Sequence, residues 1–481
     1  MLNVNRIKKK FQPDHSRVII KPHIPAGKER IEKIIMRVLN LSEEKVEQVL
    51  DRVLISFSNR HKNIREAFDK NYNKIKKYIP LNTQISDNRR ALLGAYFSLE
   101  YSIQAAAFFN PSIISHPDQS DLPEGSLRFI LSFRSVGEGH ISSIEFRSGV
   151  VNKNCNFTFD KASLYAERAQ KVSNPIYDKT TFFLKLAEMQ KPETIISQQV
   201  SELLSDEFLL SDLLDVLSNV IDSEHKEIGE NIMWLAKSNY QIQFKLDHEL
   251  SERIIFPSSR NDSNGIEDAR FVRFVDDDST VTYYATYTAY NGLSILPQII
   301  ETKDFLTFKM ITLNGEFSKN KGMALFPRKI NGKYMMISRV DGENLYVMSS
   351  DNIHFWQKAT LLKEPENEWE FVQIGNCGSP IETDQGWILL THGVGPVREY
   401  CIGIILLDLE DPSKIIGTMT EPLLVPIQEE REGYVPNVVY SCGSIIHNDN
   451  LIVPYAMSDT SSGIVTVSLS ELFNNIQKES E

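Results

Sequence analysis

Cysteine is scarce in this chain. Its 481 residues contain four cysteines, Cys155, Cys377, Cys401 and Cys442. They form no CxxC pair and no cluster with histidine at ligand spacing, which argues against a metal centre or a disulfide framework. Dispersed single thiols are typical of reduced core residues, so they favour a cytoplasmic location. We therefore expect no metal site.

Excess positive charge and long apolar runs are also missing. Lys and Arg total 52 against 64 Asp and Glu, a net charge of −12. Phosphates would be repelled, so we expect no nucleic-acid partner and no anionic membrane partner. No stretch approaches the roughly 18 apolar residues of a membrane span, and the start has no apolar signal region. The net charge does not argue against a small anion in a local basic pocket.

Two segments have helical patterning. Apolar residues recur at helical spacing from residue 28 to about 85, where Ser42 is a good N-cap, and the pattern extends through 88–109. A second helical block spans roughly 176–247. We therefore expect an N-terminal helical region over 1–95. Its apolar stripe should pack on the rest of the chain or on another subunit, which favours a homo-oligomer.

Most of the remaining chain is typical of β-structure. From about residue 125, short runs rich in β-branched and aromatic residues alternate with Gly, Asn and Asp. Two similar stretches, around Asp304 and Asp351, lie 47 positions apart, a period typical of propeller blades. Without the helical block, roughly 280 β residues remain, enough for about five blades. The pattern alone leaves a propeller and a β-sandwich equally open.

The stretch NGIEDARFVRF places adjacent carboxylates, Glu267 and Asp268, at the start of an apolar alternating run. Asn, Gly and Asp favour tight turns, so a structural turn explains it without any chemistry. The alternative is a catalytic acid held at the edge of a strand. If the backbone is extended, the two carboxylates point to opposite faces.

Six motifs in order resemble glycoside hydrolase family 130. They are GIEDAR, YYATYTAYNG, NKGMALFPRKINGKYMMISR, WILLTHGV, YVPNVVY and PYAMSD. That family comprises mannoside phosphorylases and a minority of hydrolases on a five-bladed β-propeller. The similarity extends over about 105–470. It implies a mainly β fold, with a propeller catalytic domain over 96–475, a helical insertion at about 176–247 and the N-terminal helical region.

The resemblance implies cleavage of a β-mannosidic bond with inversion. Inorganic phosphate would be the co-substrate, with no cofactor, giving α-mannose 1-phosphate and a shortened sugar. Asp268 matches the family's acid, which is proposed to pass its proton through a mannose hydroxyl. Glu267 would then support substrate binding, and Arg270 could equally pair with a neighbouring carboxylate.

A phosphate dianion leaves water only where several cations or strong donors converge. The family pattern places such groups here at Lys321, Arg339, His392 and Tyr400. Taken singly, each has an ordinary structural explanation, as a surface lysine, a strand-end arginine, a core histidine or a core tyrosine. Their occurrence together favours a phosphate site.

Sugar-binding groups are implied on both sides of the acid. These are Asn110, Ser112, Arg134, Asp341 and Asp459.

Other residues keep two interpretations. Arg147 accompanies Arg134 and fits a structural role, while Tyr290 and Tyr440 fit sugar platforms or core packing. Glu138 and His140 have no counterpart that we can place in the family. They could shape acceptor specificity or form a turn with a buried histidine.

Two other functions remain open. An inverting β-mannosidase of the same fold needs a second carboxylate to activate water and predicts glutamates in place of the basic residues. A non-catalytic carbohydrate-binding propeller would have no reason to keep Asp268 together with four anion-binding groups. The sequence does not indicate whether the linkage is β-1,2, β-1,3 or β-1,4.

Overall fold

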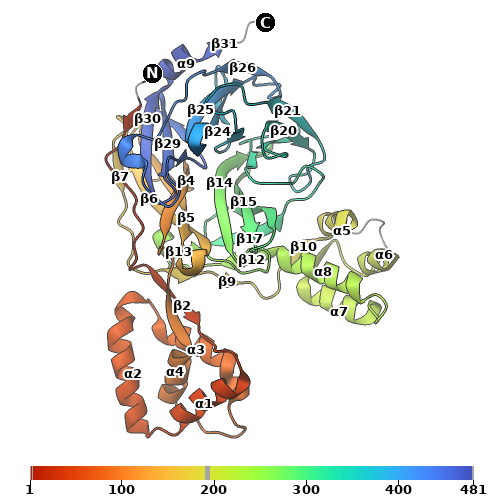
Figure 1. Ribbon diagram of the computed structural model, residues 1–481. Helices are drawn as coiled ribbons and strands as arrows, with labels where there is room; N and C mark the ends of the chain where they lie inside the picture. The colour runs from red at the N-terminus through yellow and green to blue at the C-terminus, as the bar shows by residue number, and fades with distance from the viewer. Residues whose placement is uncertain (1, 3, 190–194, 479–481) are drawn as a thin grey trace.

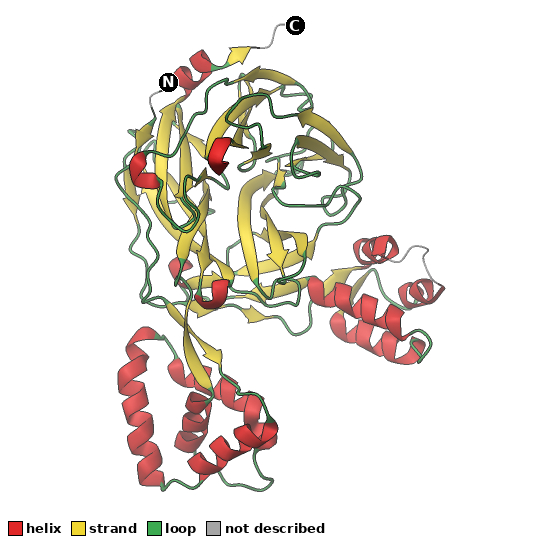
Figure 2. Ribbon diagram, viewed as in Figure 1, coloured by secondary structure: helices red, strands yellow, loops and turns green. Residues whose placement is uncertain are grey.

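The computed structural model describes residues 2, 4–189 and 195–478 and is mainly β, with helices in two separate groups (Figures 1 and 2). The expectations for residues 1 and 3, and for 190–194 within the helical block, lie outside the described residues. The strands form four larger sheets and two small ones.

The largest sheet is built from two antiparallel groups. The first group is β4 (Ala107–Ser115), β5 (Leu127–Val136) and β6 (Ser142–Val151). The second is β14 (Gly265–Val275), β15 (Val281–Tyr290), β16 (Ile295–Thr302) and β17 (Thr307–Thr312). One parallel pair, Gly265 with Ser142, joins them. Short strands extend this sheet: β7 (Phe157–Phe159), β8 (Glu167–Arg168), β9 (Gln170–Lys171), β12 (Tyr240–Gln243) and β13 (Arg253–Ile255).

Three further sheets follow along the chain. The next contains β18 (Ala324–Leu325), β19 (Tyr334–Ser338), β20 (Leu345–Ser350) and β21 (Ala359–Lys363). Another contains β22 (Gln373–Asn376), β23 (Ile381–Thr383), β24 (Gly386–Val394), β25 (Tyr400–Leu407), β26 (Ile415–Thr418) and β31 (Gln477–Lys478). The last contains β1 (Asn5–Arg6), β27 (Val439–Tyr440), β28 (Ile445–His447), β29 (Asn450–Met457) and β30 (Ser461–Ser468), followed by helix α9 (Leu469–Asn475).

The last sheet returns to the first. The Phe108 N–H donates to the Thr460 carbonyl at 2.9 Å, and the Cys442 N–H donates to the Pro111 carbonyl at 2.9 Å. β24 is buried along its whole length, which requires packing on both of its faces. The last sheet therefore packs against the first, and β24 lies inside the β body.

The N-terminal helices form a unit that stands apart from the β body (Figure 1). Its helices are α1 (Lys28–Leu39), α2 (Glu43–Phe57), α3 (Ile64–Ile75) and α4 (Asp87–Tyr96). Ser42 caps α2, as expected, by accepting from the Lys45 N–H. The apolar stripe packs within the unit around Ile35, Leu50 and Leu92. Its partner is thus the helical unit itself.

The expectation of helix over 88–109 is wrong beyond Tyr96. Residues 98–102 form β3 (Ser98–Ser102), which pairs with β2 (Val18–Pro22), and β4 begins at Ala107. The apolar residues that suggested a helix are instead buried as strand residues, Phe108 and Phe109 among them. A dense apolar run fits either periodicity, and the hydrogen bonds available in the sheet decide between them.

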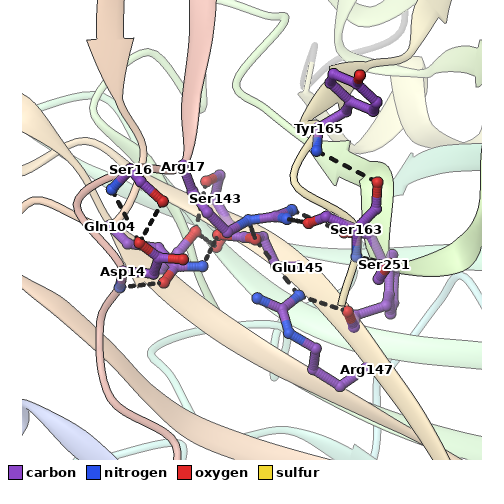
Figure 3. Close-up of polar contacts among 12 residues, drawn as sticks. Asp14, Ser16, Arg17, Gln104, Ser143, Glu145, Arg147, Ser163, Tyr165 and Ser251 are labelled. Atoms are coloured by element: carbon purple, nitrogen blue, oxygen red, sulfur yellow. Dashed lines mark hydrogen bonds and ion pairs between the residues drawn. The ribbon is translucent and has the colours of Figure 1, made fainter. Parts of the chain in front are cut away.

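The first residues of the expected helical region belong with the last sheet, because β1 pairs with β30. The following segment crosses the β body and is held by a buried ion pair, Arg17 Nε to Glu145 Oε2 at 3.0 Å (Figure 3). The same guanidinium donates to the carbonyls of Ser163 and Ser251, both at 2.7 Å. Gln104 donates to the other Glu145 oxygen at 2.8 Å.

The helical block expected at about 176–247 projects from the side of the β body (Figure 1). It contains β10 (Ile176–Asp178), β11 (Glu207–Leu209) and helices α5 (Lys179–Met189), α6 (Ile195–Glu202), α7 (Leu210–Val220) and α8 (Lys226–Ser238). These elements have their own apolar core. None of the helices in the described ranges has the length and apolar character needed to cross a lipid bilayer.

Candidate active site

A cavity of about 240 Å³ lies where strands and loops from different sheets converge. Nine residues singled out from the sequence line it, although they span 350 positions of the chain from first to last: Asn110, Arg134, Asp268, Lys321, Arg339, His392, Tyr400, Tyr440 and Asp459.

Asp268 and Asn110 lie on two facing β-bulges. The register of β14 shifts between Glu267 and Arg270, and that of β4 shifts between Phe109 and Ser112. Both bulged residues have left-handed backbone, with φ of 54° at Asp268 and 48° at Asn110. The Asn110 amide donates to Asp268 Oδ1 at 2.7 Å. Bulges beside functional sites re-aim a side chain, which is what they do here.

Both carboxylates of the NGIEDARFVRF stretch, Glu267 and Asp268, contact Arg134. Its Nη2 donates to Glu267 Oε1 at 2.8 Å, and its Nη1 donates to Asp268 Oδ1 at 3.3 Å. The expectation that the two would point to opposite faces is wrong, because the bulge interrupts strand alternation between them. Lys321 Nζ donates to the second oxygen of Glu267 at 2.6 Å. Glu267 thus positions two cations beside Asp268.

Arg270 is a buried structural residue next to the acid. Its Nε donates to the Cys377 carbonyl at 3.1 Å, its Nη1 donates to the Asp268 carbonyl at 3.2 Å, and its Nη2 donates to Tyr440 Oη. It therefore fixes the bulge of β14 against the neighbouring sheets instead of pairing with a carboxylate.

Arg339, His392 and Tyr400 form the other side of the cavity. Arg339 follows β19, and its Nη1 lies 3.4 Å from His392 Nε2. The His392 ring stacks on Tyr400 at 5.9 Å and meets Tyr440 edge-on at 5.0 Å. Gly375 packs against the imidazole so closely that a Cβ there would lie 2.4 Å from it. These contacts fix the orientation of the imidazole.

Burial and neighbouring charges shift the pKa values of Asp268, Asp459 and His392. Burial alone would raise the pKa of Asp268, but the Arg134 and Arg270 guanidiniums and the Asn110 hydrogen bond hold it below its usual range. Burial and the charge of Asp268 raise the pKa of Asp459 to about 6. Burial, with Arg339 and Arg270, keeps the pKa of His392 well below its usual value, so this histidine is neutral.

Two predicted sugar-binding residues lie outside the cavity lining. The Ser112 hydroxyl accepts from the Phe271 N–H at 3.3 Å and is buried between β4 and β14. Asp341 is exposed and accepts hydrogen bonds from its own loop, including 2.7 Å from Asn344 Nδ2 and 2.8 Å from Tyr346 Oη. Their roles in sugar binding stay predictions.

The residues that kept two interpretations differ in where they lie. Tyr440 lines the cavity, whereas Tyr290 lies outside its lining and donates to the Gly292 carbonyl at 2.9 Å. Arg147 lies 3.6 Å from Glu145 and over the Phe108 ring, in keeping with a structural role. His140 is exposed and not buried.

Sequence reasoning missed three polar side chains of the lining, those of Gln373, Asn376 and Arg398. Asn376 is fully buried, and neither its amide nitrogen nor its amide oxygen has a hydrogen-bond partner. The Arg339 Nε and His392 Nδ1 atoms are also buried and unpartnered. Buried polar atoms are normally satisfied, so a polar ligand or water belongs here. The available signal was the glycine-flanked stretch QIGNCG beside the His392 strand.

Comparison with known proteins gives a consistent result. The sequence model of glycoside hydrolase family 130, described as beta-1,4-mannooligosaccharide phosphorylase, matches residues 217–478. A 1,2-beta-oligomannan phosphorylase of Thermoanaerobacter sp. (strain X514) is 33% identical over 260 residues, which cover 52% of this chain and 83% of the relative. A beta-1,4-mannooligosaccharide phosphorylase of Ruminococcus albus is 27% identical, over 48% of this chain and 72% of the relative.

Among solved structures, a complex of the beta-1,2-mannobiose phosphorylase of Listeria innocua aligns with a TM-score of 0.47 and 22% identity. The alignment covers 78% of this chain and 92% of that chain. The family match covers more than half of the sequence, and it includes the Asp268 bulge and all four residues expected to bind phosphate. The chain therefore belongs to glycoside hydrolase family 130 and is an enzyme of that family.

Proposed function

We propose that this protein cleaves a β-mannosidic bond with inorganic phosphate, with inversion, to give α-mannose 1-phosphate and a shortened sugar. The observation that carries the proposal is Arg339. Among the ion pairs of the described chain, none includes this guanidinium, and its Nε is buried without a partner. A cation held in this way, beside a neutral histidine and a tyrosine, favours an anionic ligand.

The charge balance of the site supports a dianion. Cationic side chains outnumber carboxylates there by two: Arg134, Arg270, Lys321, Arg339 and Arg398 against Glu267, Asp268 and Asp459. Phosphate near neutral pH would cancel this excess. In a hydrolase, the position occupied by Arg339 and Lys321 would need a carboxylate to activate water. Both cations therefore support phosphorolysis over hydrolysis.

The proposed roles follow from this arrangement. Lys321, Arg339, His392 and Tyr400 bind phosphate on one face of the sugar, and Asp268 lies across the ring as the acid. Asn110, Arg134 and Asp459 bind the hydroxyls of the mannose, and Glu267 orients Arg134 and Lys321. No metal or cofactor takes part in this scheme.

The low pKa of Asp268 means that the carboxyl is ionised before substrates bind. A phosphate dianion entering the same cavity adds negative charge, which favours the protonated acid. The carboxyl can then pass this proton to the leaving oxygen, directly or through a mannose hydroxyl. Phosphate binding would thus prepare the acid as well as supply the nucleophile.

We also propose that the β body is a five-bladed propeller over 96–475. Five successive antiparallel groups support this reading: β4–β6, β14–β17, β18–β21, β22–β26 and β27–β30. Asp304 precedes β17 and Asp351 precedes β21. The two similar stretches, 47 positions apart, therefore both lie between the third and fourth strands of their groups, and these groups are neighbours. The N-terminal helical region and the insertion at about 176–247 would then be additions to this catalytic domain.

Two wider proposals accompany the activity. We place the enzyme in the cytoplasm, where its four unpaired thiols would stay reduced. We also propose a homo-oligomer, since the helical unit exposes Ile55 at 79% and Phe57 at 38%. A subunit contact would cover both side chains.

The test incubates the wild-type protein with mannobioses of β-1,2, β-1,3 and β-1,4 linkage, with and without phosphate. Mannose 1-phosphate should form only when phosphate is present, and the preferred disaccharide identifies the linkage. Release of free mannose at the same rate without phosphate would show that the protein is a hydrolase. Binding without any cleavage would favour a carbohydrate-binding role.

A further inference from the structure

We infer that His140 and Tyr434 form a stacking platform for the leaving sugar at the mouth of the active-site cavity. The inference rests on the proposed function and names where the second half of the substrate lies. The two rings belong to loops more than 290 positions apart, and their centroids lie 5.5 Å from each other at 36°.

Both rings are available to a ligand. Tyr434 is 66% exposed and His140 is also exposed. Single exposed aromatics are ordinary, but here two rings from distant loops meet in solvent. Each presents an amphipathic face, which suits a pyranose because its C–H groups form an apolar surface between polar hydroxyls.

The platform is tied to the cavity from both sides. The Tyr434 N–H donates to Thr460 Oγ1 at 2.9 Å, directly beside the lining residue Asp459. His140 lies two positions before Ser142, whose hydroxyl accepts from Arg134 Nε at 3.0 Å. Arg134 in turn contacts Asp268. The loops that carry the two rings therefore adjoin the cavity lining at Asp459 and at Arg134.

The loops around this mouth are held in unusual backbone conformations. His140 has φ of 59°, and the neighbouring loop places Val397 at 56° and Arg398 at 59°. For a β-branched residue such as Val397 this is a strained conformation, of the kind that clusters at ligand clamps. The Tyr101 hydroxyl anchors the His140 loop by donating to the Glu138 carbonyl at 2.8 Å. The loop is therefore fixed in place before a ligand arrives.

The size of the cavity supports a platform outside it. Its volume of about 240 Å³ is below the roughly 300–1,000 Å³ of most small-molecule sites. A cavity of this size favours a place on its rim for the leaving sugar once phosphate and the mannose to be transferred are bound inside. His140 and Tyr434 provide the aromatic surface at that position.

The experiment runs the reaction in the direction of synthesis, with mannose 1-phosphate as donor and mannose or β-1,2-mannobiose as acceptor. Tyr434→Ala and His140→Ala should each raise the KM of the acceptor roughly 3- to 12-fold. The KM of mannose 1-phosphate should stay within twofold of wild type. Tyr434→Phe keeps the ring and should restore the acceptor KM. Tyr96→Ala, an exposed tyrosine of the helical unit, serves as the matched control.

Each outcome decides something. Acceptor KM values unchanged in both alanine variants would overturn the platform while leaving the proposed function intact. Equal rises for donor and acceptor would show a general loss of site structure and would also overturn it. If the wild type makes no product with either acceptor, the phosphorolysis assay on the three mannobioses decides the proposed function, and titration of β-1,2-mannobiose into wild type and Tyr434→Ala tests the platform alone. Equal affinities there would reject it.

Discussion

At the scale of single residues, Asp268 has the most direct consequence. Asp268→Asn keeps the size of the side chain and its contact with Asn110, but the amide cannot protonate a leaving oxygen. Turnover of an unactivated mannobiose should fall by roughly 10²- to 10⁴-fold, while the variant should still fold. Asp276→Asn is the control, because this carboxylate lies beyond the far end of β14 and pairs with Lys329. A variant at position 268 that keeps half of the wild-type rate would exclude this residue as the acid.

Arg339 should affect the binding of phosphate more than the binding of the sugar. Arg339→Ala removes a guanidinium without a carboxylate partner, so the KM for phosphate should rise roughly 10- to 150-fold, the loss of about 1.5 to 3 kcal/mol. The KM for the mannoside should change far less. Steady-state rates over a grid of both substrates separate the two constants. A larger effect on the mannoside would place Arg339 in the sugar site instead.

The carboxyl of Asp459 makes the free energy of unfolding depend on pH. Its folded-state pKa of about 6 exceeds the ordinary value of 3.8, so the native state holds this proton more tightly than the unfolded chain. The stability that this tighter proton binding contributes is fully present below about pH 4, where Asp459 is protonated in both the native and the unfolded state. It is lost as pH rises through about 6, costing at most about 3 kcal/mol.

Asp459→Asn should therefore raise the free energy of unfolding at pH 8 and change it little at pH 4, while weakening mannoside binding. Urea denaturation of the variant and the wild type at the two pH values measures the difference. An equal effect at both would mean that this carboxyl does not titrate in the native protein.

The grouping of candidate residues was predictable where the chemistry needs one residue type at one place. Asp268, Arg339 and His392 line one cavity, as the family pattern implies. The orientation of Glu267 was not predictable, since a bulge cannot be read from strand alternation. Asn376, the last residue of β22, and Arg398, in a loop, were missed because segments distant in sequence from Asp268 bring them to the site, and no residue spacing indicates this.

At the scale of elements, the crossing segment around Arg17 depends on one buried ion pair (Figure 3). Glu145→Gln would leave Arg17 and the nearby Arg147 without a carboxylate in a buried environment. We expect a loss of about 3 to 5 kcal/mol in the free energy of unfolding. Chemical denaturation measures it.

The matched control is Asp118→Asn, which breaks the partly exposed Arg128–Asp118 pair and should cost no more than about 1 kcal/mol. The double variant Arg17→Met with Glu145→Met should recover part of the loss, because it leaves no lone charge at this pair. Similar losses for Glu145→Gln and Asp118→Asn would contradict a structural role for the buried pair.

The spacing of apolar residues predicted the type of element correctly where the pattern was long, as in α2 with its Ser42 cap. Periodicity failed at 98–109, because an apolar stretch that is buried on every side carries no period of its own. Pairing of β3 with β2 and of β4 with β5 decides that segment, and these partners lie too far along the chain to be read locally.

At the scale of the whole molecule, the helical unit and the β body have separate apolar cores. Ile35, Leu50 and Leu92 pack within the helical unit. The contacts with the body include ion pairs such as Lys245 to Glu66 at 2.7 Å and Lys62 to Glu252 at 3.1 Å. A polar cavity of about 590 Å³ lies between the two parts. Two cores joined through a wet interface should unfold in two steps.

Calorimetry should therefore resolve two unfolding transitions. The response of each transition to phosphate shows which one belongs to the β body. Phosphate binds the β body, so phosphate at about 100 times its dissociation constant should stabilise that transition by about 2.7 kcal/mol and leave the other unchanged. Leu50→Ala should lower the transition that does not respond to phosphate, by about 2 to 5 kcal/mol. A single transition that moves as a whole with phosphate and with Leu50→Ala would show that the two cores fold as one unit.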